Sequence, residues 1–413
     1  MSTEMGDCVK KLVGEELAAA AEFLTDLIRF PSLPGQEQPA IDYVRRAFEP
    51  LVDGVDPIGF PVDFERDPEY SCPLPNLSYD RRFNLRAVIN EAGPGKSLIF
   101  CTHVDVVPAS ENQPRAFDPV SSDGAIFGRG ACDAKGQVAA LFLMLRVMKR
   151  LGHQPAGTLV LHLVVEEEIG GNGALGMIRT GEKADGAVVL EPTSGAIVTS
   201  VRGAVWFRIV CRGRPGHSGS PGQTASALKA GVEAMHILEK FHQRLLTESR
   251  GIALFDELEN PMPINFGKLH SGNWPTSAPD RAVLEGVMGF LPNVSREWVM
   301  AEMECELHAE GSPLLANNFS LEFTYRHDSH VTPVDHPLVK TFQQSCRDSG
   351  GVGSLGALPA SCDSWFYSNL LQIPTVVYGP GHLRFAHSAE EQIGLSELAC
   401  AGETLTHLVL NWC

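Results

Sequence analysis

The stretch SLIFCTHVDVV, residues 97–107, decides the fold class of this chain. It begins as a nearly unbroken apolar run, typical of a strand buried on both faces of a parallel sheet, and leads to His103 and Asp105. Next, AKGQVAALFLMLRVMKRL (134–151) has the apolar spacing of a helix that ends at Gly152. This alternation predicts an α/β fold with helices on both faces of a mainly parallel sheet.

The same alternation continues toward the C-terminus. Buried strands are predicted at 158–165 (TLVLHLVV), 186–190 (GAVVL) and 374–378 (PTVVY), and a closing helix at 395–411. We therefore expect segments 1–197 and 329–413 to form the two parts of one α/β domain.

Residues 198–328 follow a different order of elements, β-α-β-β-α-β, which is the ferredoxin-like arrangement. The expected elements are a strand at 204–211, a helix at 224–246, strands at 264–269 and 282–290, a helix at 295–309 and a strand at 319–327. This order predicts an inserted α+β domain within the larger α/β domain.

The composition is that of a globular protein. The chain has 413 residues, of which 44% are hydrophobic, and its formal net charge of −17 argues against nucleic acid or an anionic membrane as main partner. It has no run of about 18 apolar residues that could span a bilayer, and residues 1–23 are typical of an amphipathic helix rather than a signal peptide. The ten cysteines form no C-x-x-C pair, so we expect no disulfide framework and a cytoplasmic location.

Histidine and acidic side chains lie where the apolar strands end. The carboxyl ends of parallel strands meet at one edge of a sheet, so side chains distant in sequence are expected to converge there. Burying several carboxylates together costs free energy unless cations neutralise them. Imidazole and carboxylate ligands without thiolate suit zinc, cobalt or manganese. Five residues occupy such positions: His103, Asp133, Glu168, Glu191 and His387.

Six ordered motifs resemble a known enzyme family. They are THVDVVP (102–108), GRGACDAKG (128–136), EEEIGGNGA (166–174), LEPT (190–193), GRPGHSGSPGQTA (213–225) and GPGHLRFAHSAEE (379–391). They resemble the dinuclear zinc metallopeptidase family of acetylornithine deacetylase, succinyl-diaminopimelate desuccinylase, carboxypeptidase G and aminoacylase. The resemblance covers most of the chain from about residue 15.

The resemblance implies two divalent metal ions, most readily Zn²⁺, with Co²⁺ or Mn²⁺ as alternatives. Asp133 would bridge them, His103 and Glu191 would complete one site, and Glu168 and His387 the other. It also implies that the inserted domain acts as a lid and dimerisation domain and that the protein is a homodimer.

Three further residues receive catalytic roles. By resemblance, Glu167 would be the general base that activates water, and His217 would reach across the dimer to stabilise the oxyanion. Asp105 lies two residues after His103 on the same face of the strand, so it can hold the imidazole in one tautomer.

The expected reaction is hydrolysis of an amide bond in an N-acyl amino acid, with a dipeptidase or carboxypeptidase as the alternative. Members of the family often grip a substrate carboxylate with an Asn and an Arg of the inserted domain. The corresponding stretch here is TSAP (276–279), and the strand after it ends in VMGFLP without arginine. The substrate-binding candidates are Asn273, Arg384 and Gly379.

Three rival functions remain at this point. GNGALG (171–176) fits the G-x-G-x-x-G dinucleotide motif of an NAD-dependent oxidoreductase, although three glutamates precede it where a pyrophosphate needs positive potential. GHSGS (216–220) only approaches the serine-hydrolase motif G-x-S-x-G. A non-catalytic binding protein would be expected to lack one or more of the five ligands, and all five are present.

Overall fold

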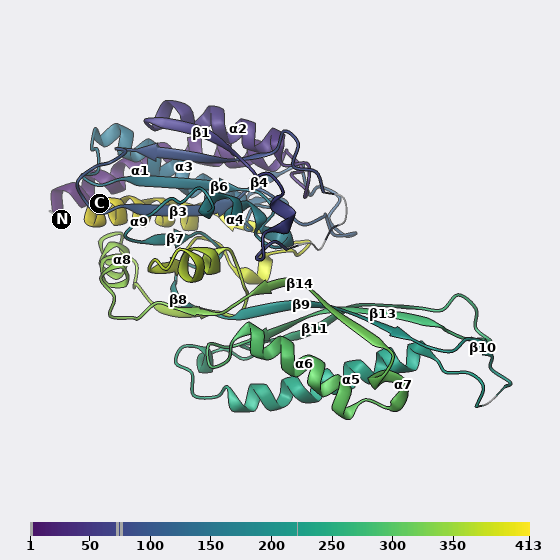
Figure 1. Ribbon diagram of the computed structural model, residues 1–413. Coiled ribbons are helices and arrows are strands. Elements are labelled where there is room, and N and C mark those ends of the chain that lie inside the picture. Colours follow the sequence, from purple (N-terminus) through teal and green to yellow (C-terminus); the bar gives the residue numbers. More distant parts are fainter. Residues whose placement is uncertain (1–2, 72–73, 75–76, 221) are drawn as a thin grey trace.

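A nine-stranded sheet runs through the larger of the two units in Figure 1, in the order β1-β2-β6-β3-β7-β17-β8-β15, with β16 also paired to β8. The computed structural model describes residues 3–71, 74, 77–220 and 222–413. The strands of this sheet are β1 (Gly54–Gly59), β2 (Phe83–Ile89), β3 (Leu98–His103), β6 (Leu159–Val164), β7 (Ala187–Val189), β8 (Ile197–Val201), β15 (His330–Val331), β16 (Leu355–Leu358) and β17 (Thr375–Val377). The central strands β6, β3, β7 and β17 are parallel, which confirms the predicted mainly parallel sheet.

Both faces of this sheet are buried, as the unbroken apolar runs predicted. Successive side chains of a strand point to opposite faces, so Leu98 and Phe100 pack in one core while Ile99 and Cys101 pack in another. The first core also contains residues of α1 (Thr3–Ile28), α2 (Gln38–Phe48), α3 (Lys135–Leu151), α8 (Pro337–Asp348) and α9 (Leu395–Trp412). The second contains residues of α4 (Asn172–Ile178) and a π-helical segment, Phe366–Leu370.

The smaller unit is a four-stranded antiparallel sheet in the order β11-β13-β9-β14, with helices against one face (Figure 1). Its elements are β9 (Gly203–Arg212), α5 (Ala227–Glu248), β11 (Ile264–Ser271), β13 (Arg281–Phe290), α6 (Arg296–Glu310), α7 (Pro313–Ala316) and β14 (Phe319–His327). This order and pairing match the predicted ferredoxin-like arrangement. Strand β8, which crosses the expected boundary at 197/198, pairs within the large sheet, and the division into three segments stays a prediction.

Two small sheets hold loops in place. The first, in the order β18-β5-β4, joins β4 (Val120–Ser122) and β5 (Ala125–Phe127) to β18 (Gln392–Gly394). Its pairing of Gln392 with Phe127 carries the segment after His387 next to the loop that contains Asp133. The second pairs β10 (Gly216–His217) with β12 (Ser277–Ala278) in the smaller unit.

The described residues agree with two further sequence-based expectations. None of their helices is both long and apolar enough to cross a membrane. The nine cysteines among them are all free thiols, as the missing C-x-x-C pairs predicted.

Candidate functional site

The polar side chains of the candidate site lie beyond the carboxyl ends of the parallel strands. Strand β3 ends at His103, the chain after β6 turns through residues 166–168, and Glu191 follows β7. Asp133 lies in the loop before α3, and His387 in the loop after β17. Because these strands are parallel neighbours, their ends bring residues 103 to 387 to one edge of the sheet.

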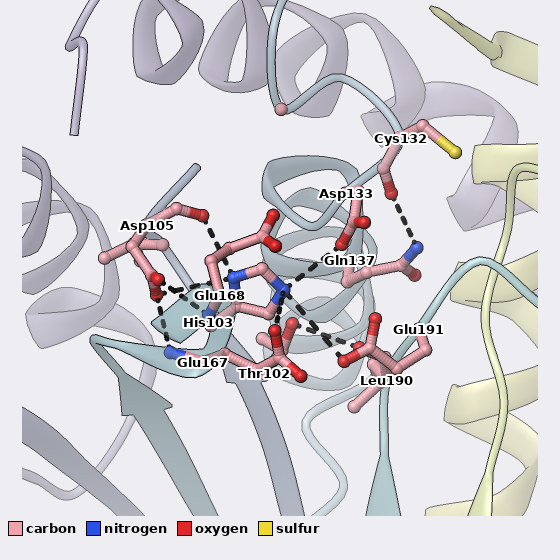
Figure 2. Close-up of polar contacts among 12 residues, drawn as sticks. Thr102, His103, Asp105, Cys132, Asp133, Gln137, Glu167, Glu168, Leu190 and Glu191 are labelled. Carbon is pink, nitrogen blue, oxygen red and sulfur yellow. Dashed lines mark hydrogen bonds and ion pairs between the residues drawn. The ribbon is translucent and has the colours of Figure 1, made fainter. Parts of the chain in front are cut away.

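Two groups of potential metal ligands share Asp133. In the first, His103 Nε2 lies 3.2 Å from Asp133 Oδ1 and 4.0 Å from Glu191 Oε1 (Figure 2). In the second, His387 Nε2 lies 3.4 Å from Asp133 Oδ2 and 3.0 Å from Glu168 Oε2. Within each group, the ligand atoms all lie within 4.8 Å of one another. The structure thus brings together the five side chains that the sequence singled out, with one Asp133 oxygen facing each group.

The tautomer of His103 follows from its hydrogen bond to the main chain. His103 Nδ1 lies 3.0 Å from the backbone carbonyl of Asp105, an acceptor, so Nδ1 carries a proton and Nε2 is the nitrogen that could bind a metal ion. The Asp105 carboxylate lies 3.4 Å from the same nitrogen and also accepts the backbone N–H groups of Glu167 and Glu168, at 3.2 and 3.1 Å. Asp105 therefore supports both His103, a candidate ligand, and the turn through Glu166–Glu168, called the acidic turn below.

Glu391 holds the loop that carries Asp133. One Glu391 oxygen, Oε1, accepts the backbone N–H groups of Gly130, Cys132 and Asp133 at 3.0–3.1 Å. Its other oxygen, Oε2, binds the buried guanidinium of Arg129. These contacts explain why the GRGACDAKG loop lies against the C-terminal motif that contains His387.

Hydrogen bonds and charges shift the pKa values of the two histidines. Burial alone would lower the pKa of His103, but bonds to Asp105 and Asp133 raise it well above its ordinary value. Burial likewise opposes protonation of His387, whose pKa its bonds to Asp133 and Glu168 raise to about 10. Burial and the charge of Asp133 raise the pKa of Glu168 to about 7. This cluster of acids therefore favours a positive charge at its centre.

The donor set fits a pair of divalent cations. Glu191 Oε1 is buried without a hydrogen-bond partner, which is costly unless a cation fills that role. Burial raises the pKa of Glu191 well above its ordinary value, as does the charge of Asp133, although His103 opposes both. Two imidazoles and three carboxylates without thiolate form a nitrogen and oxygen set that suits zinc, cobalt or manganese.

Glu167 belongs to neither ligand group but lines the same cavity. Its Oε2 lies 4.0 Å from His103 Nε2, and burial and the Glu191 charge raise its pKa well above the ordinary value. The cavity has a volume of about 240 Å³. The residues that line it are Asp133, Glu167, Glu168, Glu191, Pro192, Leu358, Ala360, Ser361, Cys362, Leu383, Ala386 and His387.

The other sequence candidates lie outside this cavity. Strand β10 ends at His217, an exposed residue at the far end of the smaller unit (Figure 1), and Asn273 is exposed on the loop before β12. The Arg384 guanidinium lies 4.6 Å from the centre of the Phe385 ring, beside residues that line the cavity. Gly379 packs behind Glu191, where a Cβ would come within 2.6 Å of the Glu191 carbonyl.

Sequence reasoning missed two acids near the candidate ligands. Glu391 sits four residues after His387 in the same motif, and that proximity is the signal that could have revealed it. Asp363 is 2% exposed, and its Oδ1 is buried without a hydrogen-bond partner. Burial raises the pKa of Asp363 to about 7. Asp363 follows no apolar strand directly, so the pattern of acids at strand ends gave no sign of it.

The model of Peptidase family M20/M25/M40 matches residues 99–411. This chain belongs to that family. Members of the M20 family hydrolyse amide and peptide bonds, so the chain is a hydrolase of that class. The family assignment does not support the oxidoreductase alternative. The glycines at 171–176 belong to the turn and short helix α4 that follow Glu166–Glu168.

Curated M20 relatives and one solved structure show how far the likeness extends. The N-formyl-4-amino-5-aminomethyl-2-methylpyrimidine deformylase from Bacillus subtilis (strain 168) is 25% identical over an alignment of 347 positions, which covers 77% of this chain and 79% of that protein. Acetylornithine deacetylase from Proteus mirabilis (strain HI4320) is 24% identical over an alignment of 406 positions, which covers 96% of this chain and 98% of that one. The crystal structure of human carnosine dipeptidase 1 matches with a TM-score of 0.76 and 14% identity, covering 98% of this chain and 99% of that one.

Proposed function

We propose that this M20 hydrolase is a two-metal deacylase of N-acyl amino acids, similar to acetylornithine deacetylase. The observation that carries the proposal is the pair of ligand groups that share Asp133, each with its ligand atoms within 4.8 Å of one another. His103 and Glu191 would complete one ion site and Glu168 and His387 the other. Two divalent ions held there, most readily Zn²⁺ and otherwise Co²⁺ or Mn²⁺, would polarise the substrate carbonyl and lower the pKa of the attacking water.

Glu167 is the residue we propose as general base. Its carboxylate lines the cavity and lies 4.0 Å from His103 Nε2, yet it belongs to neither ligand group, so it is free to exchange protons. It would accept a proton from the attacking water and then pass it to the leaving amine. Such general acid–base catalysis typically contributes about 10²–10⁴-fold to the rate.

We further propose a cytoplasmic homodimer in which His217 of one subunit serves the partner's cavity. His217 is exposed on β10, and no hydrogen bond or ion pair among the described residues joins it to the metal ligands of its own chain. An oxyanion donor of this kind contributes roughly 10²–10³-fold to catalysis.

Removal of metal from the protein is the direct test of this function. We expect the zinc- or cobalt-loaded protein to release amine from members of a panel of N-acetyl amino acids, N-succinyl amino acids and dipeptides. Treatment with a chelator should abolish that release, and added Zn²⁺ or Co²⁺ should restore it. Turnover that survives complete metal removal would overturn the two-metal proposal.

The cavity wall predicts which acyl groups are accepted. Besides the acidic residues and His387, its lining consists of small or apolar residues such as Ala360 and Leu358, and the described lining includes no lysine or arginine. An acid group on the acyl chain would therefore be buried without a partner, which costs about 1–3 kcal/mol or more. We expect kcat/KM for an N-acetyl amino acid to exceed that for its N-succinyl analogue by roughly 10- to 100-fold.

A pair of variants checks this explanation of acyl preference. Ala360→Arg would add a cation to the cavity wall. It should therefore lower the ratio of kcat/KM for the N-acetyl substrate to kcat/KM for the N-succinyl substrate. Ala360→Gln, a long side chain without charge, is the matched control and should leave N-succinyl turnover low. A wild-type enzyme that prefers N-succinyl substrates would show that the prediction is wrong.

A further inference from the structure

Glu166, the first acid of the Glu166–Glu168 run, faces away from the cavity that its two successors line. Its side chain is fully buried, and its backbone adopts a φ of 65°, in the left-handed region that non-glycine residues rarely occupy. Glu166 Oε2 accepts hydrogen bonds from Tyr79 Oη at 2.9 Å and from Asn172 Nδ2 at 3.0 Å. This turn therefore sends one carboxylate into the core and the next two toward the catalytic cavity.

Arg82 is the cation that meets Glu166 in the core. Its guanidinium is 7% exposed and lies between two acids, with Nη1 at 2.5 Å from Glu166 Oε1 and Nη2 at 2.6 Å from Glu37 Oε1. Arg82 Nε also donates to Glu37 Oε2 at 3.2 Å, so Glu37 is bound in a two-point fork. Glu37 is held in turn by the backbone N–H of Gly35 at 2.9 Å.

The turn through Glu166–Glu168 is held by two sets of contacts: the buried network of Arg82 and Glu37 binds Glu166, and Asp105 binds the backbone of the next two residues. The Asp105 carboxylate accepts the backbone N–H groups of Glu167 and Glu168, and Arg82 holds the residue just before them. Neither Arg82 nor Glu37 lines the cavity or belongs to a ligand group. A buried ion pair is weak evidence for stability alone, because an apolar replacement often serves equally well.

We propose that Arg82 is a positioning residue: through Glu166 it sets the direction of the Glu167 and Glu168 carboxylates. The inference rests on the proposed two-metal function, since it concerns the base and one ligand of that site. The fixed planar fork of arginine can hold Glu37 and Glu166 at once, whereas the single ammonium of lysine meets such a geometry less well. Partners of this kind outside the ligand set typically contribute 10- to 100-fold to metal affinity or activity.

The test compares Arg82→Met and Arg82→Lys with a matched control, Arg86→Met. Arg86 lies on β2 and forms its own partly buried fork to Glu182, with distances of 2.5 and 3.0 Å, and neither residue lines the cavity. Four quantities are measured for each protein: the Co²⁺ affinity by calorimetry without substrate, kcat, KM, and the Tm of the metal-free form.

We expect Arg82→Met to lower both Co²⁺ affinity and kcat by roughly 10- to 100-fold with little change in KM. Arg82→Lys should recover part of both, while Arg86→Met should lower the Tm and leave Co²⁺ affinity and kcat unchanged. If Arg82→Met fails to fold, Arg82→Lys alone tests the inference, and it should show a smaller loss of Co²⁺ affinity and kcat.

Two results would overturn the inference. One is an Arg82→Lys protein with wild-type Co²⁺ affinity and kcat, and the other is an equal loss of both quantities in Arg86→Met. A failure of the proposed function is distinguishable from these, because the wild-type protein itself would then bind no Co²⁺.

Discussion

Replacing Glu167 with alanine will abolish measurable turnover while the protein still binds two metal ions per chain. Glu167 lines the cavity but belongs to neither ligand group, so its loss removes the proposed proton carrier and leaves both ion sites complete. The expected loss in kcat is at least about 10²–10⁴-fold, the range that general acid–base catalysis contributes. Turnover is measured as the rate of amine release, and metal content is measured by elemental analysis of the purified protein.

A nearby acid provides the control for this experiment. Glu390 is exposed and lies three residues after His387, so Glu390→Ala removes one carboxylate close to the site without touching the cavity. We expect wild-type kcat and metal content for that variant. Wild-type turnover in Glu167→Ala would remove Glu167 from its proposed role.

Replacing Asp133 with alanine will remove both metal ions along with activity. One Asp133 oxygen faces His103 at 3.2 Å and the other faces His387 at 3.4 Å, so a single substitution deprives both groups of a ligand. We expect metal content below one ion per chain. Metal at a concentration of 100 times its dissociation constant should raise the free energy of unfolding of the wild-type protein by about 2.7 kcal/mol per site. The variant should show no such increase.

The melting temperature with and without Zn²⁺ measures that stabilisation directly. Asp118→Ala is the matched control, because Asp118 is an exposed acid that pairs with Arg115 and does not line the cavity. Its metal-dependent rise in Tm should equal that of the wild-type protein. An Asp133→Ala protein that retains two ions would exclude Asp133 as the shared ligand.

The fold and the convergence of the five candidate ligands could be predicted because they depend on local patterns. An apolar run such as 158–165 marks a strand buried on both faces, and parallel strands align their carboxyl ends. That rule is enough to gather His103, Glu168 and Glu191 at one edge. Strand β3 ends at His103, four residues earlier than the end of the apolar pattern, because the chain turns there and Val106 N–H donates to Ser32 O.

The residues that support the ligands could not be predicted in the same way. Glu37, Arg82 and Glu166 are far apart in sequence, and each in isolation has the pattern of a solvated surface charge. Their contact depends on how the loop before β2 packs on the acidic turn, which no local periodicity encodes. Asp363 could not be predicted for a related reason, because this buried acid lies in a loop that does not directly follow an apolar strand.

The two histidines proposed as ligands differ sharply in their exposure to water. The His103 side chain is 1% exposed and sits at the end of a central strand, whereas the His387 side chain is 51% exposed on a loop. Thermal opening of a loop requires far less free energy than opening of a core strand. The two halves of the centre should therefore differ in kinetics, with fast loading and release on the His387 side and long residence on the His103 side. A protein purified from dilute metal would then carry one ion rather than two.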